Sequence, residues 1–186
     1  MKPTEQQHQS LIDLCKNNNA KAQMQLYTLY CDAMVTISYR YVKDRFVAED
    51  VMQEAFIKAF KNIHSYKNEV PFGSWLKRIV INQSIDYIKK RKLELVSINE
   101  ELTHKQEDET DWQVDTEMNV ESIVNTINGL KDKYRLVMSL YLLEGYDHSE
   151  ISEILKITEN TSRTHLLRGK NLLKEQLKGI RYETGY

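Results

Sequence analysis

Hydrophobic residues recur at helical spacing along most of the chain. Between residues 22 and 41 they follow one another at intervals of three or four, which predicts one long helix with a single buried stripe. The members of this stripe are Ala22, Leu26, Leu29, Ala33, Ile37 and Tyr41. A shorter helix around residues 11–15 is expected to precede it.

A second amphipathic helix is predicted after a break near Lys43 and Asp44. Its apolar positions match the i, i+3, i+4, i+7 template and are Ala48, Val51, Met52, Ala55, Phe56, Ala59, Phe60 and Ile63. The loop that follows, residues 64–73, contains Pro71 and Gly73, which favour an interruption. Another helix is predicted from about Ser74 to Lys92, and it ends in four consecutive cations.

Helical periodicity fades between residues 93 and 120, where the composition becomes acidic. This interval holds one lysine, Lys105, against nine acids, namely Glu94, Glu100, Glu101, Glu107, Asp108, Glu109, Asp111, Asp115 and Glu117. An acidic stretch without an apolar face predicts a flexible linker. The chain should therefore contain two domains, residues 1–92 and 121–186, joined by a linker over residues 93–120.

Periodicity returns from Glu121, and the second domain should contain four helices. Gly129 and Gly145 stand where helices would stop, and Ser149 is the expected N-cap of the third helix. Few glycines and prolines, six and two respectively, leave little material for the turns of a β-rich fold. The predicted fold class is therefore all-α, with an N-terminal helical bundle and a C-terminal four-helix domain.

The last two helices of this domain form a predicted helix-turn-helix. Thr158 can cap the second of them, Leu166 and Leu173 should face the core, and a short link joins the pair. The opposite side carries Asn160, Arg163, Thr164, Leu167 and Arg168, with His165, Lys170 and Lys174 nearby. Arg, Thr and Asn suit base or phosphate contacts, although such cations also occur on any solvated helix face. The helix-turn-helix alone therefore leaves DNA binding and a bare surface helix both open.

The net charge of −1 is an average over segments of opposite sign, since the linker acids offset cations on either side. The start of the chain lacks the pattern of a signal peptide and no long apolar run occurs, which predicts a cytoplasmic protein without membrane insertion. Cys15 and Cys31 are expected to be reduced, buried thiols. The chain has no nucleotide-binding glycine motif and no clustered metal ligands, so we expect no catalytic residue, no metal and no cofactor.

Two helical surfaces have polar residues that amphipathicity alone does not explain. Glu49 and Asp50 fit the dipole of a helix start, but Gln53 and Glu54 lie one turn further on. On the following helix Trp75, Arg78, Asn82, Asp86 and Lys89 share one side. A tryptophan beside an asparagine, under a loop with Tyr66 and Phe72, offers a surface for an unstacked base, while core packing is the alternative for Trp75.

Three segments in register resemble the sigma factors of bacterial RNA polymerase. They are AEDVMQEAFIKAF at residues 48–60, PFGSWLKRIVINQSIDYIKKRK at 71–92 and LEGYDHSEISEILKITENTSRTHLLRGK at 143–170. The group that the chain resembles is the small extracytoplasmic-function sigma factors, which keep the second and fourth conserved regions of the primary factors.

The resemblance implies that Asp50, Gln53 and Glu54 bind the clamp helices of the polymerase largest subunit, with Phe56 in the core. It implies contacts to the minus-ten element, including a flipped base, from Tyr66, Phe72, Trp75, Arg78, Asn82, Lys89, Lys90, Arg91 and Lys92. The minus-thirty-five element would be read by Asn160, Thr161, Arg163, Thr164, Arg168 and Lys170. An anti-sigma factor is a further partner that the family implies.

The reading helix departs from the family pattern at its start, and two of the changes alter the character of the side chain. Members commonly carry Gly-Thr-Val-Arg-Ser-Arg, where this chain has Asn160-Thr-Ser-Arg-Thr-His165. Ser162 thus replaces an apolar core residue and His165 replaces a cation, and both changes bear on the bases that are read. The competing hypothesis is a helix-turn-helix repressor or response-regulator output domain acting on duplex operator DNA, which leaves the two polar surfaces of the first domain without a purpose.

Overall fold

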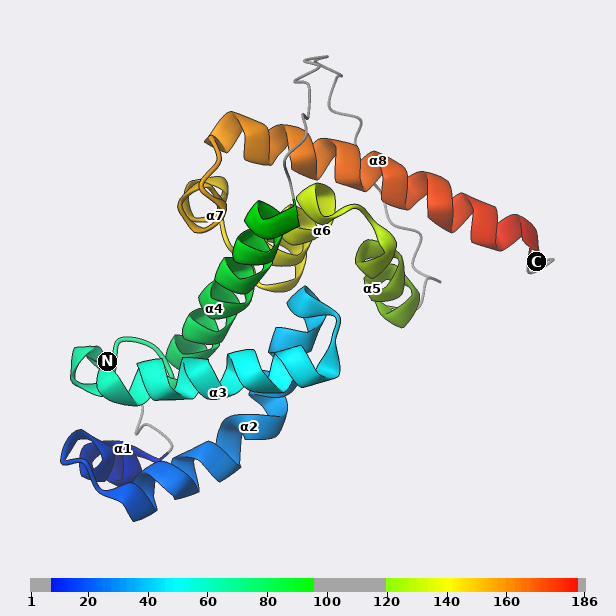
Figure 1. Ribbon diagram of the computed structural model, residues 1–186. Helices are drawn as coiled ribbons and strands as arrows, with labels where there is room; N and C mark the ends of the chain where they lie inside the picture. The colour runs from blue at the N-terminus through cyan, green and yellow to red at the C-terminus, as the bar shows by residue number, and fades with distance from the viewer. Residues whose placement is uncertain (1–7, 96–119, 184–186) are drawn as a thin grey trace, which may run out of the picture. The chain divides into compact units, whose positions relative to one another are not determined.

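The computed structural model describes residues 8–95 and 120–183, and of 92–95 and 178–183 it describes the helical backbone alone. Every regular element in these ranges is a helix, which confirms the all-α prediction (Figure 1). The chain divides into two compact units, residues 1–98 and 99–186, called here the N-terminal unit and the C-terminal unit. Most of the predicted linker, residues 96–119, lies outside the described residues.

Four α-helices and one short 3₁₀-helix build the N-terminal unit. They are α1 (Gln9–Lys16), α2 (Ala20–Val42), α3 (Arg45–Lys61), η1 (Ile63–Ser65) and α4 (Phe72–Leu95). Side chains cap two of them, because Asn19 accepts from the amide of Ala22 at 3.0 Å and Asp44 accepts from that of Val47 at 3.1 Å. Helices α2, α3 and α4 pack against one another, and α1 packs on α2 (Figure 1).

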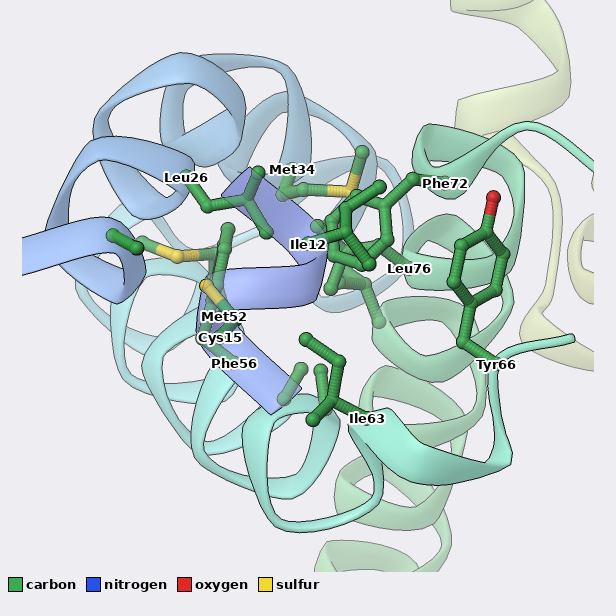
Figure 2. Close-up of a cluster of buried hydrophobic side chains, with 14 residues drawn as sticks. Ile12, Cys15, Leu26, Met34, Met52, Phe56, Ile63, Tyr66, Phe72 and Leu76 are labelled. Atoms are coloured by element: carbon green, nitrogen blue, oxygen red, sulfur yellow. The ribbon is translucent and has the colours of Figure 1, made fainter. Parts of the chain in front are cut away.

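The core of the N-terminal unit is assembled from all five of these elements. Figure 2 shows Ile12 and Cys15 of α1 among side chains from α2, α3, η1 and α4. All the apolar positions predicted for residues 48–63 are buried, apart from Phe60, which is half-buried. Rings interlock within this core, since Phe56 lies 4.9 Å from Tyr27 and 5.8 Å from Phe60 between centroids.

The buried side of α2 differs from the predicted stripe. Leu29 is 52% exposed and Ala33 is exposed, whereas Met34 and Ser38 are buried. The reason is that α2 packs on both α3 and α4, and the α4 contact includes a polar pair. The hydroxyls of Ser38 and Ser84 lie 3.2 Å apart with both side chains fully buried. A search for apolar residues does not find a buried serine.

The C-terminal unit contains the four predicted helices and one additional turn. Its elements are α5 (Val120–Gly129), α6 (Asp132–Met138), the π-helix η2 (Ser139–Leu143), α7 (His148–Leu155) and α8 (Glu159–Glu183). Gly129 ends α5, and Gly145 follows η2 with a φ of 76°, a conformation that glycine adopts without strain.

The N-cap of α7 is Asp147, so the prediction of Ser149 is wrong. The carboxylate of Asp147 accepts from the amide of Glu150 at 2.8 Å, and the carboxylate of Glu150 accepts from the amide of Asp147 at 3.1 Å. This reciprocal capping box satisfies two amides at once, which one serine hydroxyl cannot do. Ser149 lies in the first turn of α7 instead.

Helices α6 and α8 approach closely at Gly169. A Cβ built on Gly169 would lie 2.9 Å from Cγ of Met138 and would collide with its Sδ. The neighbouring α6 residue Arg135 is 2% exposed, and its guanidinium contacts the carboxylate of Asp132 at 2.7 Å. The close approach of these helices thus depends on the missing side chain at Gly169, and α6 carries a buried charge beside it.

Both cysteines are free thiols. Cys15 is buried, as predicted, and burial raises the pKa of its thiol, whereas Cys31 is only half-buried. Among the described helices, none is both long and apolar enough to cross a membrane.

Candidate nucleic-acid interface

Helix α3 presents Asp50, Gln53 and Glu54 on its exposed side. The apolar residues between and beside them, from Ala48 to Phe56, are buried, and Phe56 is a core residue as predicted. Because α3 starts at Arg45, Glu49 and Asp50 lie beyond its first turn. Glu49 instead forms an ion pair with Arg45 at 3.2 Å. The dipole of the helix start therefore explains these acids less well than the sequence suggested.

A groove of about 700 Å³ lies between α2 and α3, beside this exposed face. Gln53, Glu49 and Arg45 line it from α3, and Asp32 and Tyr39 are among the lining residues of α2. The exposed face of α3 thus continues into a groove with polar and aromatic walls.

Glu54 also links α3 to α4. Its carboxylate accepts a hydrogen bond of 2.8 Å from the side-chain amide of Gln83. Gln83 is the neighbour of Asn82 in sequence, and Asn82 is one of the residues expected to contact the minus-ten element. A partner that binds Glu54 therefore contacts a residue that is hydrogen-bonded to Gln83 of α4, next to Asn82 in the sequence.

The aromatic residues expected beside an unstacked base occupy different positions. Tyr66 and Phe72 are only 3% and 2% exposed, so the expectation that they offer ring surface to a base is wrong for this structure. Their rings pack edge to face at 5.4 Å, and the hydroxyl of Tyr66 donates to the carbonyl of Val70 at 2.7 Å. They are buried because each ring completes the core under the loop. Trp75 is half-buried and lies 5.3 Å from Tyr66 between centroids.

The polar residues of α4 are accessible to different extents. Arg78, Asp86, Lys90 and Arg91 are exposed, while Asn82 and Lys89 are half-buried. The side chain of Lys92 lies outside the described residues. Trp75, Arg78, Asn82 and Lys89 are separated by three, four and seven residues, so α4 brings them to one side, next to two exposed cations.

The helix-turn-helix consists of α7, the link 156–158 and α8. The hydroxyl of Thr158 accepts from the amide of Thr161 at 3.1 Å, which confirms Thr158 as the cap. Leu166 and Leu173 are buried, also as predicted. Thr161 contacts the Thr158 hydroxyl through its own hydroxyl at 2.8 Å.

The predicted reading residues differ in exposure along α8. Asn160 and Arg163 are exposed, and the guanidinium of Arg163 contacts the carboxylate of Glu159 at 2.8 Å. Thr164, Arg168 and Lys170 are half-buried, and the Thr164 hydroxyl donates to the carbonyl of Asn160 at 2.9 Å. His165 packs edge to face on Tyr134 at 5.7 Å. The first turns of α8 therefore present the most accessible donors.

One polar contact of the helix-turn-helix was not predicted from the sequence. Nδ1 of His148, at the start of α7, lies 2.8 Å from Oγ of Ser162 in α8. Ser162 is 0% exposed, so it stands at a core position, as the departure from the family pattern suggested. The signal that could have revealed it is that unusual serine, because a buried hydroxyl needs a partner.

Comparisons with known proteins agree with the two-unit architecture. Residues 26–94 match the family described as Sigma-70 region 2, and residues 121–173 match Sigma-70, region 4. The ECF RNA polymerase sigma factor SigW of Bacillus subtilis (strain 168) is 33% identical over 179 residues, which cover 91% of this chain and 96% of SigW. The chain belongs to the ECF RNA polymerase sigma factors.

Further similarities support this membership. The ECF RNA polymerase sigma factor SigM of B. subtilis is 28% identical over 151 residues, covering 81% of this chain and 91% of SigM. The fold resembles that of the sigma factor RpoE from Bartonella quintana, solved in complex with the anti-sigma factor NepR, with a TM-score of 0.53 and 21% identity. That comparison covers 83% of this chain and 96% of RpoE.

The function of the chain is accordingly that of a sigma factor in transcription initiation, which binds core RNA polymerase and directs it to promoters. Sigma factors act as binding subunits and are not enzymes. The repressor hypothesis needs the C-terminal unit alone, and it finds no support because the family match includes residues 26–94.

Proposed function

We propose that this sigma factor divides its contacts between its two units. Asp50, Gln53 and Glu54 of α3 bind the clamp helices of the polymerase largest subunit. One side of α4 binds and helps to melt the minus-ten element, and the start of α8 reads the minus-thirty-five element. The corresponding domains are residues 1–92 and 121–186, with residues 93–120 as the linker.

The observation that carries this proposal is the composition of the exposed side of α3. Asp50, Gln53 and Glu54 are all exposed, while the apolar residues Ala48, Val51, Met52, Ala55 and Phe56 fix the opposite side in the core. Polar groups on a rigid helix lose little conformational freedom when a partner binds. Two carboxylates on one face also favour a basic partner surface and exclude an acidic one.

The minus-ten contact is assigned to Trp75, Arg78, Asn82, Lys89, Lys90, Arg91 and Lys92. Lys90 and Arg91 are exposed and suit phosphates, which position the strand without reading its sequence. Trp75 and Asn82 are half-buried, so they suit a base removed from the stack. Tyr66 and Phe72 support this site from the core rather than touching DNA.

The minus-thirty-five contact is assigned to Asn160, Thr161, Arg163, Thr164, Arg168 and Lys170. Arg163 is available to guanine edges because the ion pair that holds it is exposed and lies between residues one helical turn apart. Such a pair contributes only about 0.3–0.5 kcal/mol. DNA can therefore displace Glu159 from Arg163 at little cost, while the neighbouring threonines position the helix on phosphates.

An anti-sigma factor is the second protein partner that we propose. The support is the Bartonella quintana sigma factor RpoE, which was solved in complex with the anti-sigma factor NepR. A protein that covers α3 of this chain would compete with core polymerase. Co-purification of the tagged chain from its own cells, followed by displacement with added core polymerase, tests this partner; displacement supports it, and a co-purified protein that core polymerase leaves bound argues against it.

Capture of core polymerase by the tagged chain tests the α3 contact. Asp50→Lys with Glu54→Lys should reduce capture strongly, because it places cations where the clamp meets carboxylates. A matched control is Asp13→Lys with Glu175→Lys, which makes the same change in net charge at two exposed acids on α1 and α8. Equal capture by both double variants would contradict the assignment.

Run-off transcription from a cognate promoter tests the two DNA contacts. Arg163→Ala with Arg168→Ala should sharply reduce transcription from that promoter, leaving a measurable residue, without reducing capture of core polymerase. Trp75→Ala with Asn82→Ala should permit promoter binding but reduce strand opening, which permanganate reactivity of unpaired thymines detects. Full transcription by either double variant would remove the corresponding residues from the proposal.

A further inference from the structure

The two helices of the helix-turn-helix are joined by one buried polar contact. Nδ1 of His148 lies 2.8 Å from Oγ of Ser162, and the Ser162 side chain is completely buried. His148 is the first residue of α7, where the capping box of Asp147 and Glu150 fixes the backbone. Its imidazole is therefore a fixed point against which α8 is held.

The imidazole of His148 also stacks on an aromatic ring. Its ring stacks on Tyr141 of η2 with centroids 4.9 Å apart and planes at 24°. Nζ of Lys170 in α8 lies 6.0 Å from the centroid of the same tyrosine ring. His148 thus connects three elements, namely η2, α7 and α8.

Charged groups surround His148 on both helices. Burial lowers the pKa of His148, Arg163 and Lys170 lower it further, and Glu159 and Asp147 oppose them. The imidazole is therefore neutral at neutral pH, and one of its two nitrogens accepts while the other donates. Either direction of the bond to the Ser162 hydroxyl satisfies that buried group.

The position of Ser162 makes this contact relevant to base reading. Arg163 follows it directly, and Asn160 precedes it by two residues on the exposed side of α8. Side-chain ends lie roughly 5–6 Å from a helix axis, so a rotation of about 20° moves them by roughly 2 Å. A hydrogen bond to a base edge tolerates only about 0.5 Å of variation in donor–acceptor distance.

We propose that His148 is a positioning residue for promoter recognition, whose contact with the buried Ser162 hydroxyl sets the rotation of α8 and thereby selects the bases of the minus-thirty-five element. This inference rests on the proposed reading of that element by α8. According to this inference, His148 determines promoter specificity without contacting DNA itself. Truncation at position 148 is therefore expected to change which promoters are preferred.

The test is multi-template run-off transcription by the holoenzyme, on promoters that differ only in single base pairs of the minus-thirty-five element. His148→Phe keeps a ring against Tyr141 but loses the hydrogen bond. His148→Asn lacks the ring but places an amide close to the position of Nδ1. Ser162→Ala removes the hydroxyl, and the double variant His148→Phe with Ser162→Ala completes a thermodynamic cycle.

We expect His148→Phe and Ser162→Ala to change the relative strengths of these promoters by about tenfold at one or more positions, as expected for a lost base contact of modest strength. The double variant should resemble either single variant, and His148→Asn should restore the wild-type order of preference. Promoters that differ in the minus-ten element should keep their relative strengths. Thermal unfolding identifies any variant that fails to fold; if either His148→Phe or Ser162→Ala fails, the other carries the test, with His148→Asn as the variant expected to keep the wild-type order.

Two outcomes would overturn the inference. One is an equal loss on all templates, which indicates a structural role without selectivity; the other is a wild-type order of preference in both His148→Phe and Ser162→Ala. Arg163→Ala with Arg168→Ala is run on the same templates to separate this inference from the proposed function. If Arg163→Ala with Arg168→Ala leaves the promoter preferences unchanged, α8 does not read the element and both proposals fail. If this double variant removes the preferences while His148→Phe and Ser162→Ala keep them, the positioning role alone fails.

Discussion

The two units of this sigma factor stabilise their helices in different ways. The core of the N-terminal unit consists of apolar side chains and interlocking rings, with Ser38 and Ser84 as its buried polar pair among the described residues. The C-terminal unit buries Arg135, Ser139 and Ser162. Two of them contact polar side chains, since Arg135 lies beside Asp132 and Ser162 lies beside His148.

This difference suggests how each unit responds to change. Apolar packing is non-directional, so the N-terminal unit should lose stability in proportion to the volume removed from its core. Hydrogen bonds and ion pairs require fixed geometry, so the C-terminal unit should respond to single polar substitutions and to pH. A reading helix held by directional contacts has a defined rotation, whereas an exposed binding face such as that of α3 needs only a rigid base.

The largest expected effect is a cavity in the N-terminal core. Phe56→Ala should lower the free energy of unfolding by about 3–5 kcal/mol, because it removes a ring that packs on Tyr27 and Phe60. The next residue, Ile57, is exposed, and Ile57→Ala should change the free energy of unfolding by less than about 0.5 kcal/mol. Urea denaturation of both variants checks this prediction, and similar losses would show that α3 does not pack as described.

The buried charge of the C-terminal unit should give the next effect. Asp132→Ala removes the carboxylate beside the buried Arg135 guanidinium and should cost about 1.5–3 kcal/mol, the usual range for hydrogen bonds to charged groups. Glu159→Ala breaks an ion pair of similar length that is exposed, and should cost about 0.3–0.5 kcal/mol. Chemical denaturation of both variants compares them directly; equal costs would mean that the burial of Arg135 is unimportant.

Close helix packing at Gly169 predicts a smaller loss. Gly169→Ala should cost about 1 kcal/mol, since overpacking costs about 1–3 kcal/mol and the better helix propensity of alanine returns about 0.5–1 kcal/mol. A methyl group added at Gly129 would meet no atom within 4 Å, so Gly129→Ala should be neutral or stabilising. Melting temperatures that fall for Gly129→Ala and not for Gly169→Ala would contradict the described approach of α6 and α8.

The smallest effect should be a dependence of stability on pH that arises from His148. Its pKa in the folded chain lies below the ordinary value of 6.5, so the unfolded chain binds the proton more readily. The contribution of His148 to the free energy of unfolding is therefore complete above pH 6.5, and it is lost as the pH falls through that value toward the pKa of the folded chain. Unfolding of the wild type and of His148→Asn between about pH 5 and 8 should differ in slope, and identical slopes would contradict the description of this site.

Much of the fold was predictable from the sequence because helices leave a periodic signal. The apolar set of α3 and the two leucines that anchor α8 were identified from spacing alone. The buried side of α2 was not, because Ser38 is buried by its contact with a serine far along the chain. Periodicity records which residues are apolar, and it carries no information on polar partners from distant segments.

The candidate sites were predictable to a different extent. Exposed carboxylates on α3 and an exposed arginine at the start of α8 follow from their place opposite the buried stripe. Tyr66 and Phe72 were misjudged, since an aromatic residue in a loop is compatible with either a surface or a core position, and their packing with Trp75 decides between them. The contact between His148 and Ser162 depends on how two helices meet, which the sequence of either helix does not specify.

The division of contacts between the two units is tested most directly by photo-crosslinking in the promoter-bound holoenzyme. A photoreactive residue is placed in turn at Gln53, Asn82 and Arg163, one for each proposed surface. We predict cross-links from position 53 to the polymerase largest subunit, from position 82 to the minus-ten element and from position 163 to the minus-thirty-five element. Cross-links from position 53 to DNA, or from position 163 to protein alone, would contradict the account.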